Sequence, residues 1–292
     1  MKSWLSLAVL TFWLAGCDRL PSSSSSTSAE PLAPETTNAA ATTAAAMLSN
    51  TPIAPRPSAP AESDAESYQR ARELEGEGKL ADARSLLQPV ADDGSASDKV
   101  LDLLSEIDTK MLFTPAPAPE KTDYTIVSGD SLGRLAQRYS TTIDLIKKSN
   151  NLTRDMIRVG DRLRIYQGLF AVNVSKSTNE LRLTDNGKFF KRYRVGTGEY
   201  SKTPVGEFKI TSRVANPPWW RADGKVIPYG DPENILGTHW LGLNVIGYGI
   251  HGTWETNSIG KQATAGCIRL LNDDIAELYT ILPVGSTVVI HE

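Results

Sequence analysis

The chain has 292 residues, with 31 basic and 34 acidic residues and a formal net charge of −3. At about 150 residues per domain, this length predicts two or more folded units. The near-balance of charges argues against a dedicated nucleic-acid binder, which needs a basic surface. With only two cysteines and three histidines, a cysteine-rich disulfide scaffold and a four-cysteine zinc site are excluded. We therefore expect neither a metal nor a cofactor.

The N-terminus is typical of an export signal. Lys2 supplies a positive charge, and the apolar stretch from Ser3 to Gly16 is shorter than the roughly 18 residues of a membrane span. The stretch ends in Leu-Ala-Gly-Cys17, which resembles the lipobox of bacterial lipoproteins. The resemblance implies cleavage after residue 16 and lipidation of Cys17, so that acyl chains anchor a periplasmic protein of the cell envelope to a membrane. The alternative is an ordinary cleaved signal followed by an incidental cysteine.

Two segments of contrasting composition follow. Residues 17–61 are predicted to be a disordered tether, because 32 of the 41 residues from 21 to 61 are Ser, Thr, Ala or Pro. Residues 62–112 carry apolar side chains at helical spacing, which predicts two or three helices similar to a tetratricopeptide hairpin. We favour a helical spacer or dimerising arm over a peptide-binding repeat, because such repeats need about three copies. A protein partner for this segment stays open. Residues 113–122 are Pro-rich and predicted to be a stiff linker.

Residues 123–167 are predicted to fold as strand, helix, helix, strand. The first strand ends at Gly129-Asp130, and either Asp130 or Ser131 can cap the first helix. The spacing of apolar residues, glycines and asparagine through this segment resembles a LysM module. The resemblance implies binding to glycans that contain N-acetylglucosamine, such as peptidoglycan strands, at the loops between strands and helices. The alternative is a retained fold without sugar affinity. The candidate glycan-binding residues are Gly129, Asp130, Ser131 and Asn151.

Residues 168–292 change to an alternating pattern of strands, with Gly and Pro dense between them. We expect strands at 170–175, 180–184, 188–195, 207–212 and 287–291, and one helix at 273–280. The pattern predicts a mainly β domain, either a sandwich or a barrel.

A search for a nucleophile in this domain is short. Besides the lipidated cysteine, Cys267 is the one remaining thiol, and it can pair with His239, His251 or His291. His291 is penultimate and expected to fray, and His239 is expected in a loop. Both His251 and Cys267 have glycine neighbours, which allow close backbone approach. A thiolate attacks carbonyl carbons after an imidazole takes its proton, and the backbone N–H groups of Gly266 and Cys267 can form an oxyanion hole. From the residues alone, a catalytic pair and a buried structural cysteine are equally favoured.

The runs His251-Gly-Thr253 and Ala263-Thr-Ala-Gly-Cys-Ile-Arg-Leu270 resemble the signature of the L,D-transpeptidase (YkuD-type) family. The resemblance covers about residues 169–292. It implies a β-rich domain, peptidoglycan tetrapeptide stems as acyl donors, Cys267 as nucleophile and His251 as base, with the imidazole oriented by a backbone carbonyl, that of Gly252. Further catalytic candidates are Gly266 and Arg269, of which the arginine either positions the loop or a substrate carboxylate or makes a structural salt bridge. The substrate-binding candidates are Trp219, Tyr229, Thr253 and Thr264.

Ala265 departs from the family pattern, which commonly has a histidine there, so rate, substrate or acceptor can differ. The aromatic runs 216–220 and 227–230 are expected either as exposed loops over the groove or as core. Together these features predict a peptidoglycan L,D-transpeptidase that forms 3-3 cross-links through a cysteine thioester. The alternatives are an L,D-carboxypeptidase or amino-acid exchange enzyme, and a non-catalytic peptidoglycan-binding lipoprotein.

Overall fold

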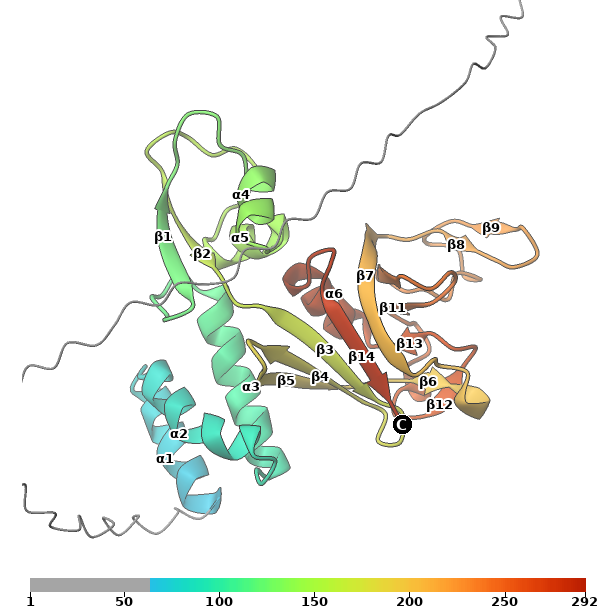
Figure 1. Cartoon of the computed structure of the whole chain (residues 1–292), viewed down its shortest axis with the longest axis horizontal. Helices are drawn as coiled ribbons and strands as arrows, with labels where there is room; N and C mark the ends of the chain where they lie inside the picture. Colours follow the sequence, from blue (N-terminus) through green and yellow to red (C-terminus); the bar gives the residue numbers. More distant parts are fainter. Residues whose placement is uncertain (1–63) are drawn as a thin grey trace, which may run out of the picture. The chain divides into compact units, whose positions relative to one another are not determined.

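The computed structural model describes residues 64–292, and Figure 1 shows them in colour. The predicted export signal, Cys17 and the tether lie outside the described residues. Within the described range, no helix is both long and apolar enough to cross a membrane.

Three helices begin the described chain: α1 (Asp64–Gly76), α2 (Leu80–Asp92) and α3 (Asp98–Phe113). Their apolar residues recur every three or four positions, so one stripe of each helix is buried in a shared cluster around Leu87, Leu104 and Ile107. The turn between α1 and α2 places Gly78 at a φ of 76°, a left-handed conformation that favours glycine. The predicted helical segment is therefore present as a three-helix layer.

A small module follows, built from β1 (Lys121–Thr125), α4 (Leu132–Arg138), α5 (Ile143–Ser149) and β2 (Arg162–Tyr166). The two strands pair antiparallel, and the helices pack on them through Leu135, Ile146 and Ile165. Both helices are capped by their sequence: the Ser131 hydroxyl accepts the Arg134 N–H, and the Thr142 hydroxyl accepts that of Leu145. The predicted order of strand, helix, helix, strand is confirmed, with Ser131 as the cap.

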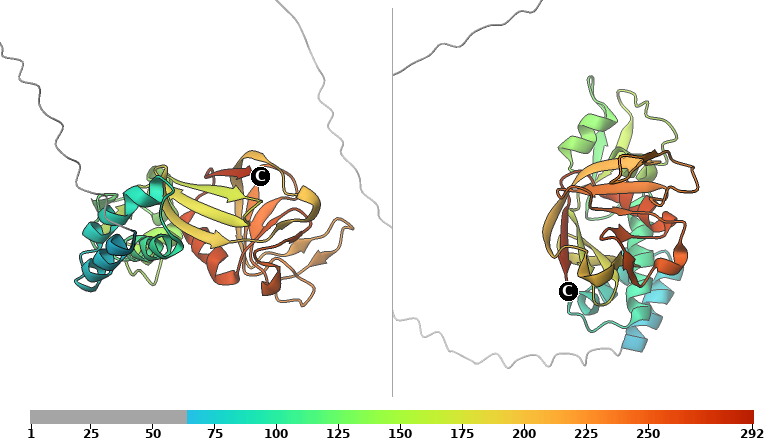
Figure 2. Two further views of the ribbon diagram at one scale, coloured as in Figure 1. Left: turned by 90° about the horizontal axis from the view of Figure 1, so that it is seen from below. Right: turned by 90° about the vertical axis from the view of Figure 1, so that its right-hand side faces the viewer.

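The rest of the chain forms an eight-stranded mixed sheet in the order β13-β11-β10-β7-β14-β3-β4-β5. The sheet is curled, and α6 lies against β10 and β11 (Figures 1 and 2). The prediction of a mainly β domain is confirmed. The strands of the sheet are β3 (Phe170–Ser175), β4 (Glu180–Asp185), β5 (Lys188–Arg194), β7 (Gly206–Ala215), β10 (His239–Leu243), β11 (Gly249–His251), β13 (Ile268–Arg269) and β14 (Thr287–His291). The remaining elements are β6 (Thr197–Gly198), η1 (Glu199–Ser201), β8 (Trp219–Trp220), β9 (Val226–Ile227), η2 (Thr256–Ser258), β12 (Gln262–Thr264) and α6 (Asn272–Ile281).

The core lies between the inner face of this sheet and α6. Alternate residues of β3 and β14, such as Val172, Val174 and Ile290, are fully buried, and they meet Ile275 and Leu278 of α6. The period of two along each strand gives one apolar face to bury, as the sequence predicted. His239 is a correction, because it begins strand β10 instead of lying in a loop. His291 is paired in β14 with an exposed side chain.

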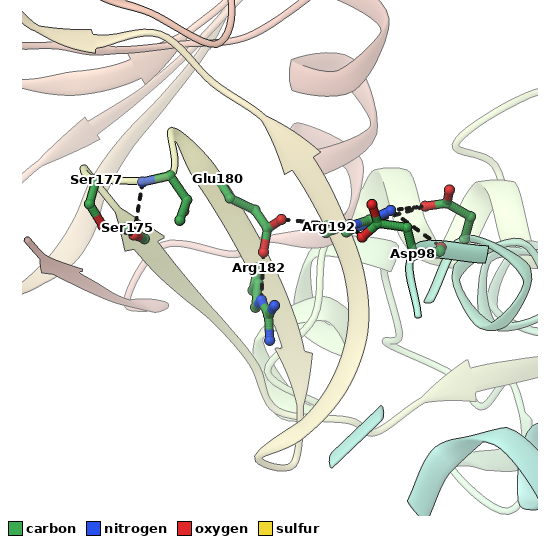
Figure 3. Close-up of polar contacts among 8 residues, drawn as sticks. Asp98, Ser175, Ser177, Glu180, Arg182 and Arg192 are labelled. Carbon is green, nitrogen blue, oxygen red and sulfur yellow. Dashed lines mark hydrogen bonds and ion pairs between the residues drawn. The ribbon is translucent and has the colours of Figure 1, made fainter. Parts of the chain in front are cut away.

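The helical layer is attached directly to the edge strand β5. Phe189 of β5 is buried in the helical cluster, and its backbone N–H and carbonyl bond the side chains of Asp92 and Gln88 at 2.9 and 2.8 Å. Arg192 pairs with Asp98 of α3, as Figure 3 shows. It also pairs with Asp102 of the same helix, at 2.8 Å. The three helices are therefore joined to the eight-stranded sheet, because Phe189 of β5 supplies part of the core of the helices.

Candidate active site

Strands β11 and β13 bring the predicted nucleophile and base to one face of the sheet. The two strands are parallel, with Ile250 beside Ile268 and His251 beside Arg269. One position earlier in this register, Cys267 lies beside Gly249. The isoleucines point into the core, so Cys267 and His251 share the opposite face. The pairing of β11 with β13 thus brings together two residues that are 16 positions apart in the sequence.

The imidazole of His251 is held in one orientation and kept away from water. Its Nδ1 lies 2.6 Å from the Gly252 carbonyl oxygen, and the residue is only 2% exposed. A carbonyl only accepts, so Nδ1 carries the proton and Nε2 is left with a free lone pair. Burial lowers the pKa of His251 to about 4, against a smaller opposing effect of the Gly252 carbonyl. The side chain is therefore a neutral base near pH 7.

The thiol of Cys267 is half-buried, and its Sγ lies 3.5 Å from the carbonyl oxygen of Gly247. Burial raises the pKa of the thiol, while the Gly249 backbone N–H and the charge of Arg269 lower it in part. The resting pair is thus a neutral thiol beside a neutral imidazole. Proton transfer from sulfur to nitrogen then accompanies attack on a carbonyl carbon.

The turn that carries Cys267 is fixed by two threonine hydroxyls. Thr264 donates to the Cys267 carbonyl at 2.6 Å and accepts the Gly266 N–H at 3.2 Å. Thr203 donates to the Gly266 carbonyl at 2.9 Å and accepts the Gly198 N–H at 2.7 Å. The Gly266 N–H is therefore already used, which corrects its predicted part in an oxyanion hole. Thr264 is buried and serves this turn.

Arg269 is a buried loop anchor. Its guanidinium donates to Glu255 at 2.9 Å and to the Ser258 hydroxyl at 3.2 Å, and its backbone pairs with Gly196. The loop after His251 is held in this way, and Thr253 in the same loop is buried with its hydroxyl accepting the Glu255 N–H. The structure therefore shows Arg269 in a salt bridge that positions this loop.

The aromatic runs form a small hairpin instead of irregular loops. Trp219 is half-buried on β8 opposite Ile227, and Tyr229 follows β9 with 40% of its surface exposed. The buried Asn234 closes the base of the hairpin, because its amide donates to the carbonyls of Pro217 and Ile227. Trp219 and Tyr229 thus lie on a hairpin tied to the sheet near β10.

The glycan-binding candidates fall into two separate turns of the small module. Asp130 accepts the Tyr124 hydroxyl at 2.8 Å and the Val127 N–H at 2.9 Å, and the Gly129 carbonyl accepts from Arg134. These contacts, with the Ser131 cap, build the first turn. Asn151 is exposed in the second turn, where its N–H bonds the Lys148 carbonyl.

Sequence reasoning missed three side chains at the site. The Trp240 ring is stacked on that of His251, with centroids 5.8 Å apart. Tyr248 covers Gly266. The Asn272 carboxamide oxygen accepts the Thr238 N–H at 3.0 Å, and a Cβ on Gly252 would collide with that same oxygen. The glycines near the candidate site indicated that another group packs closely against the backbone there. A single sequence does not say which side chain that is. Among residues 64–292, no group of three or more His, Cys, Asp or Glu could hold a metal.

Comparison with known proteins identifies the fold and the family. The profile of the L,D-transpeptidase catalytic domain (YkuD) matches residues 170–290, and that of the LysM domain matches residues 124–165. The putative L,D-transpeptidase YqjB of Bacillus subtilis is 41% identical over 127 residues, which are 41% of this chain and 70% of that protein. The putative L,D-transpeptidase YkuD of the same organism is 31% identical over 175 residues, 58% of this chain and 98% of that protein.

Among solved structures, an L,D-transpeptidase from Mycobacterium smegmatis aligns with a TM-score of 0.38 and 21% identity. The alignment covers 46% of this chain and 65% of that one. From the two relatives in Bacillus subtilis and the matched domains, the chain belongs to the L,D-transpeptidase family and carries a LysM domain beside the catalytic domain.

Proposed function

We propose that this protein is a peptidoglycan L,D-transpeptidase that works through an acyl-enzyme on Cys267. The proposal depends above all on one observation: Cys267 and His251 lie on one face of neighbouring strands, and the Gly252 carbonyl holds the imidazole with its free nitrogen unprotonated. A neutral base beside a half-buried thiol is what general-base activation of a cysteine needs.

The reaction proceeds in two steps. The Cys267 sulfur attacks the carbonyl carbon of the third stem residue, an S–C bond forms and the C–N bond to the terminal D-alanine breaks. His251 takes the thiol proton and gives it to the leaving amine. The side-chain amine of the third residue of a neighbouring stem then attacks the thioester carbon. A C–N bond forms the 3-3 cross-link, the S–C bond breaks, and the proton lost by the amine passes through His251 to the sulfur. With the Gly266 N–H engaged, the Cys267 N–H is the remaining donor that the sequence offered for the oxyanion.

The other domains concentrate this reaction on the cell wall. Binding of glycan strands by the LysM domain raises the effective concentration of stem peptides near Cys267. Lipidation of Cys17 anchors the chain to a membrane of the envelope and places it in the periplasm. The Ser, Thr, Ala and Pro-rich segment up to residue 61 supplies the reach between anchor and wall.

Mass spectrometry of products from a disaccharide-tetrapeptide tests the catalytic proposal. Residues 64–292, the part of the chain that the structure describes, are suitable for the assay. A dimer that has lost one D-alanine supports transpeptidation, whereas a tripeptide indicates the carboxypeptidase alternative. Cys267→Ala abolishes turnover and leaves binding to insoluble peptidoglycan unchanged. Equal turnover in that variant rules out the thioester, and no turnover in the wild type leaves a peptidoglycan-binding lipoprotein.

A further inference from the structure

Trp240 contacts His251 and lies over Gly249 on the neighbouring strand β11. It pairs with His251 in the register of β10 and β11, and the two rings stack at 5.8 Å with an angle of 22° between their planes. The same indole covers Gly249, the strand neighbour of Cys267: a Cβ on Gly249 would lie 2.5 Å from the six-membered ring of Trp240.

Two glycines make room for this indole. Gly242 and Gly249 are cross-strand partners, and a Cβ on Gly242 would lie 2.8 Å from Trp240 Nε1 and 2.3 Å from the Ser212 hydroxyl. Real Cβ atoms do not approach that closely, so any side chain at either position forces the ring to move. Neither glycine has a left-handed φ. Gly242 and Gly249 therefore serve to leave space for the indole of Trp240.

We propose that Trp240 is a positioning residue of the catalytic dyad, whose indole fixes the plane of the His251 imidazole and shields it from water. The proposal rests on the proposed function and deepens it. Trp240 is half-buried while His251 is fully buried, so the ring forms the layer between imidazole and solvent. It acts through His251 and takes no part in bond making.

The shielding has a measurable consequence for the base. Burial is the main cause of the low pKa of His251, about 4 against an ordinary value of 6.5. Loss of the indole lets water reach the imidazole, so its pKa rises toward the ordinary value. Besides burial, the charge of Arg269 lowers this pKa, and hydrogen bonds to the backbone carbonyls of Gly252 and Leu236 raise it. None of them changes when Trp240 is replaced.

The test uses imidazole NMR on the full chain, which has only three histidines to assign. Trp240→Leu should raise the pKa of His251 by more than one unit and lower kcat about 10- to 100-fold, with KM changed by less than twofold, as expected for a displaced base. Trp240→Phe keeps an aromatic ring over His251, so its His251 pKa and its kcat should both stay close to the wild-type values. Gly242→Ala displaces the ring from the other side and should shift the pKa in the same direction. Gly133→Ala is the matched control, because its new Cβ meets the Ile143 side chain at an ordinary 3.9 Å.

An unchanged pKa of His251 in Trp240→Leu overturns the proposal, whatever happens to activity. Equal losses in the Leu and Phe variants, with the same fall in Tm and no change in pKa, show that the indole is only part of the core. The NMR titration does not depend on turnover. If the wild type fails to process tetrapeptide, the proposed function fails while the role of Trp240 is still measured.

Discussion

Replacing Phe189 with Ala tests whether the helical layer and the catalytic sheet share one core. Phe189 belongs to β5 but is 6% exposed within the cluster of α1, α2 and α3. Truncation of a buried phenylalanine costs about 3–5 kcal/mol of the free energy of unfolding. Its backbone bonds to Asp92 and Gln88 do not involve the ring, so the loss measures apolar contact alone. With a urea m-value of about 3 kcal/mol/M, the midpoint falls by roughly 1–2 M.

Unfolding of the helical layer and of the eight-stranded sheet can be followed by separate spectroscopic signals. Every tryptophan after residue 63 lies in the catalytic domain, at 219, 220, 240 and 254, whereas α1, α2 and α3 dominate the circular dichroism of helices. We expect both signals to unfold together in the wild type and both midpoints to fall in Phe189→Ala. Tyr200→Ala is the control, because this ring is 88% exposed and its removal should change the free energy of unfolding by less than about 0.5 kcal/mol. Separate transitions in the wild type, or an unchanged midpoint in Phe189→Ala, would refute the shared core.

Three further outcomes are expected. His251→Gln removes the buried imidazole and should make the free energy of unfolding less dependent on pH. Because folding lowers the pKa of His251, the wild type should lose stability relative to the variant as the pH falls from 6.5 to about 4. Urea titrations should show a relative loss of up to about 3 kcal/mol. Asn272→Ala leaves the Thr238 N–H without its acceptor and should lower the free energy of unfolding by about 1–3 kcal/mol, with kcat reduced more than KM; Asn272→Asp keeps an oxygen and should recover part of it. Ala265→His should fold normally, because Ala265 is exposed, and a change in the ratio of dimer to tripeptide products would show that this position selects the acceptor.

Secondary structure was accessible from the sequence because its signals are local. Strand β3 alternates buried and half-buried residues over six positions, and Ser131 and Thr142 precede helices as capping residues do. Cys267 and His251 became candidates because few thiols and imidazoles were available, and the family resemblance then favoured this pair. These inferences needed no knowledge of which strands pair.

Features that depend on long-range contacts were not accessible. Nothing local distinguishes Phe189, buried under helices, from Phe190, which points to the other side of β5 into the sheet core. The Gly266 N–H was assigned to an oxyanion hole because glycine precedes the cysteine, but the Thr264 hydroxyl two residues away accepts it. A side chain can satisfy a donor that the sequence leaves open, and only the folded turn shows which donor remains.

The resting protonation state of the dyad has a bearing on where the protein is proposed to work. A low pKa on a cysteine gives a standing thiolate, which is the form that oxidants attack. Here burial moves the two groups in opposite directions, with the pKa of Cys267 raised and that of His251 lowered, so the ion pair is disfavoured until a carbonyl is in place. For a thiol in the oxidising compartment that we propose, this arrangement limits oxidation while a neutral base lies on the same face of the sheet. The Gly247 carbonyl stabilises the protonated form by accepting from Sγ, and the Gly249 N–H stabilises the thiolate once it forms. Two neighbouring backbone groups thus stabilise different protonation states of Cys267: the Gly247 carbonyl stabilises the resting thiol, and the Gly249 N–H stabilises the reactive thiolate.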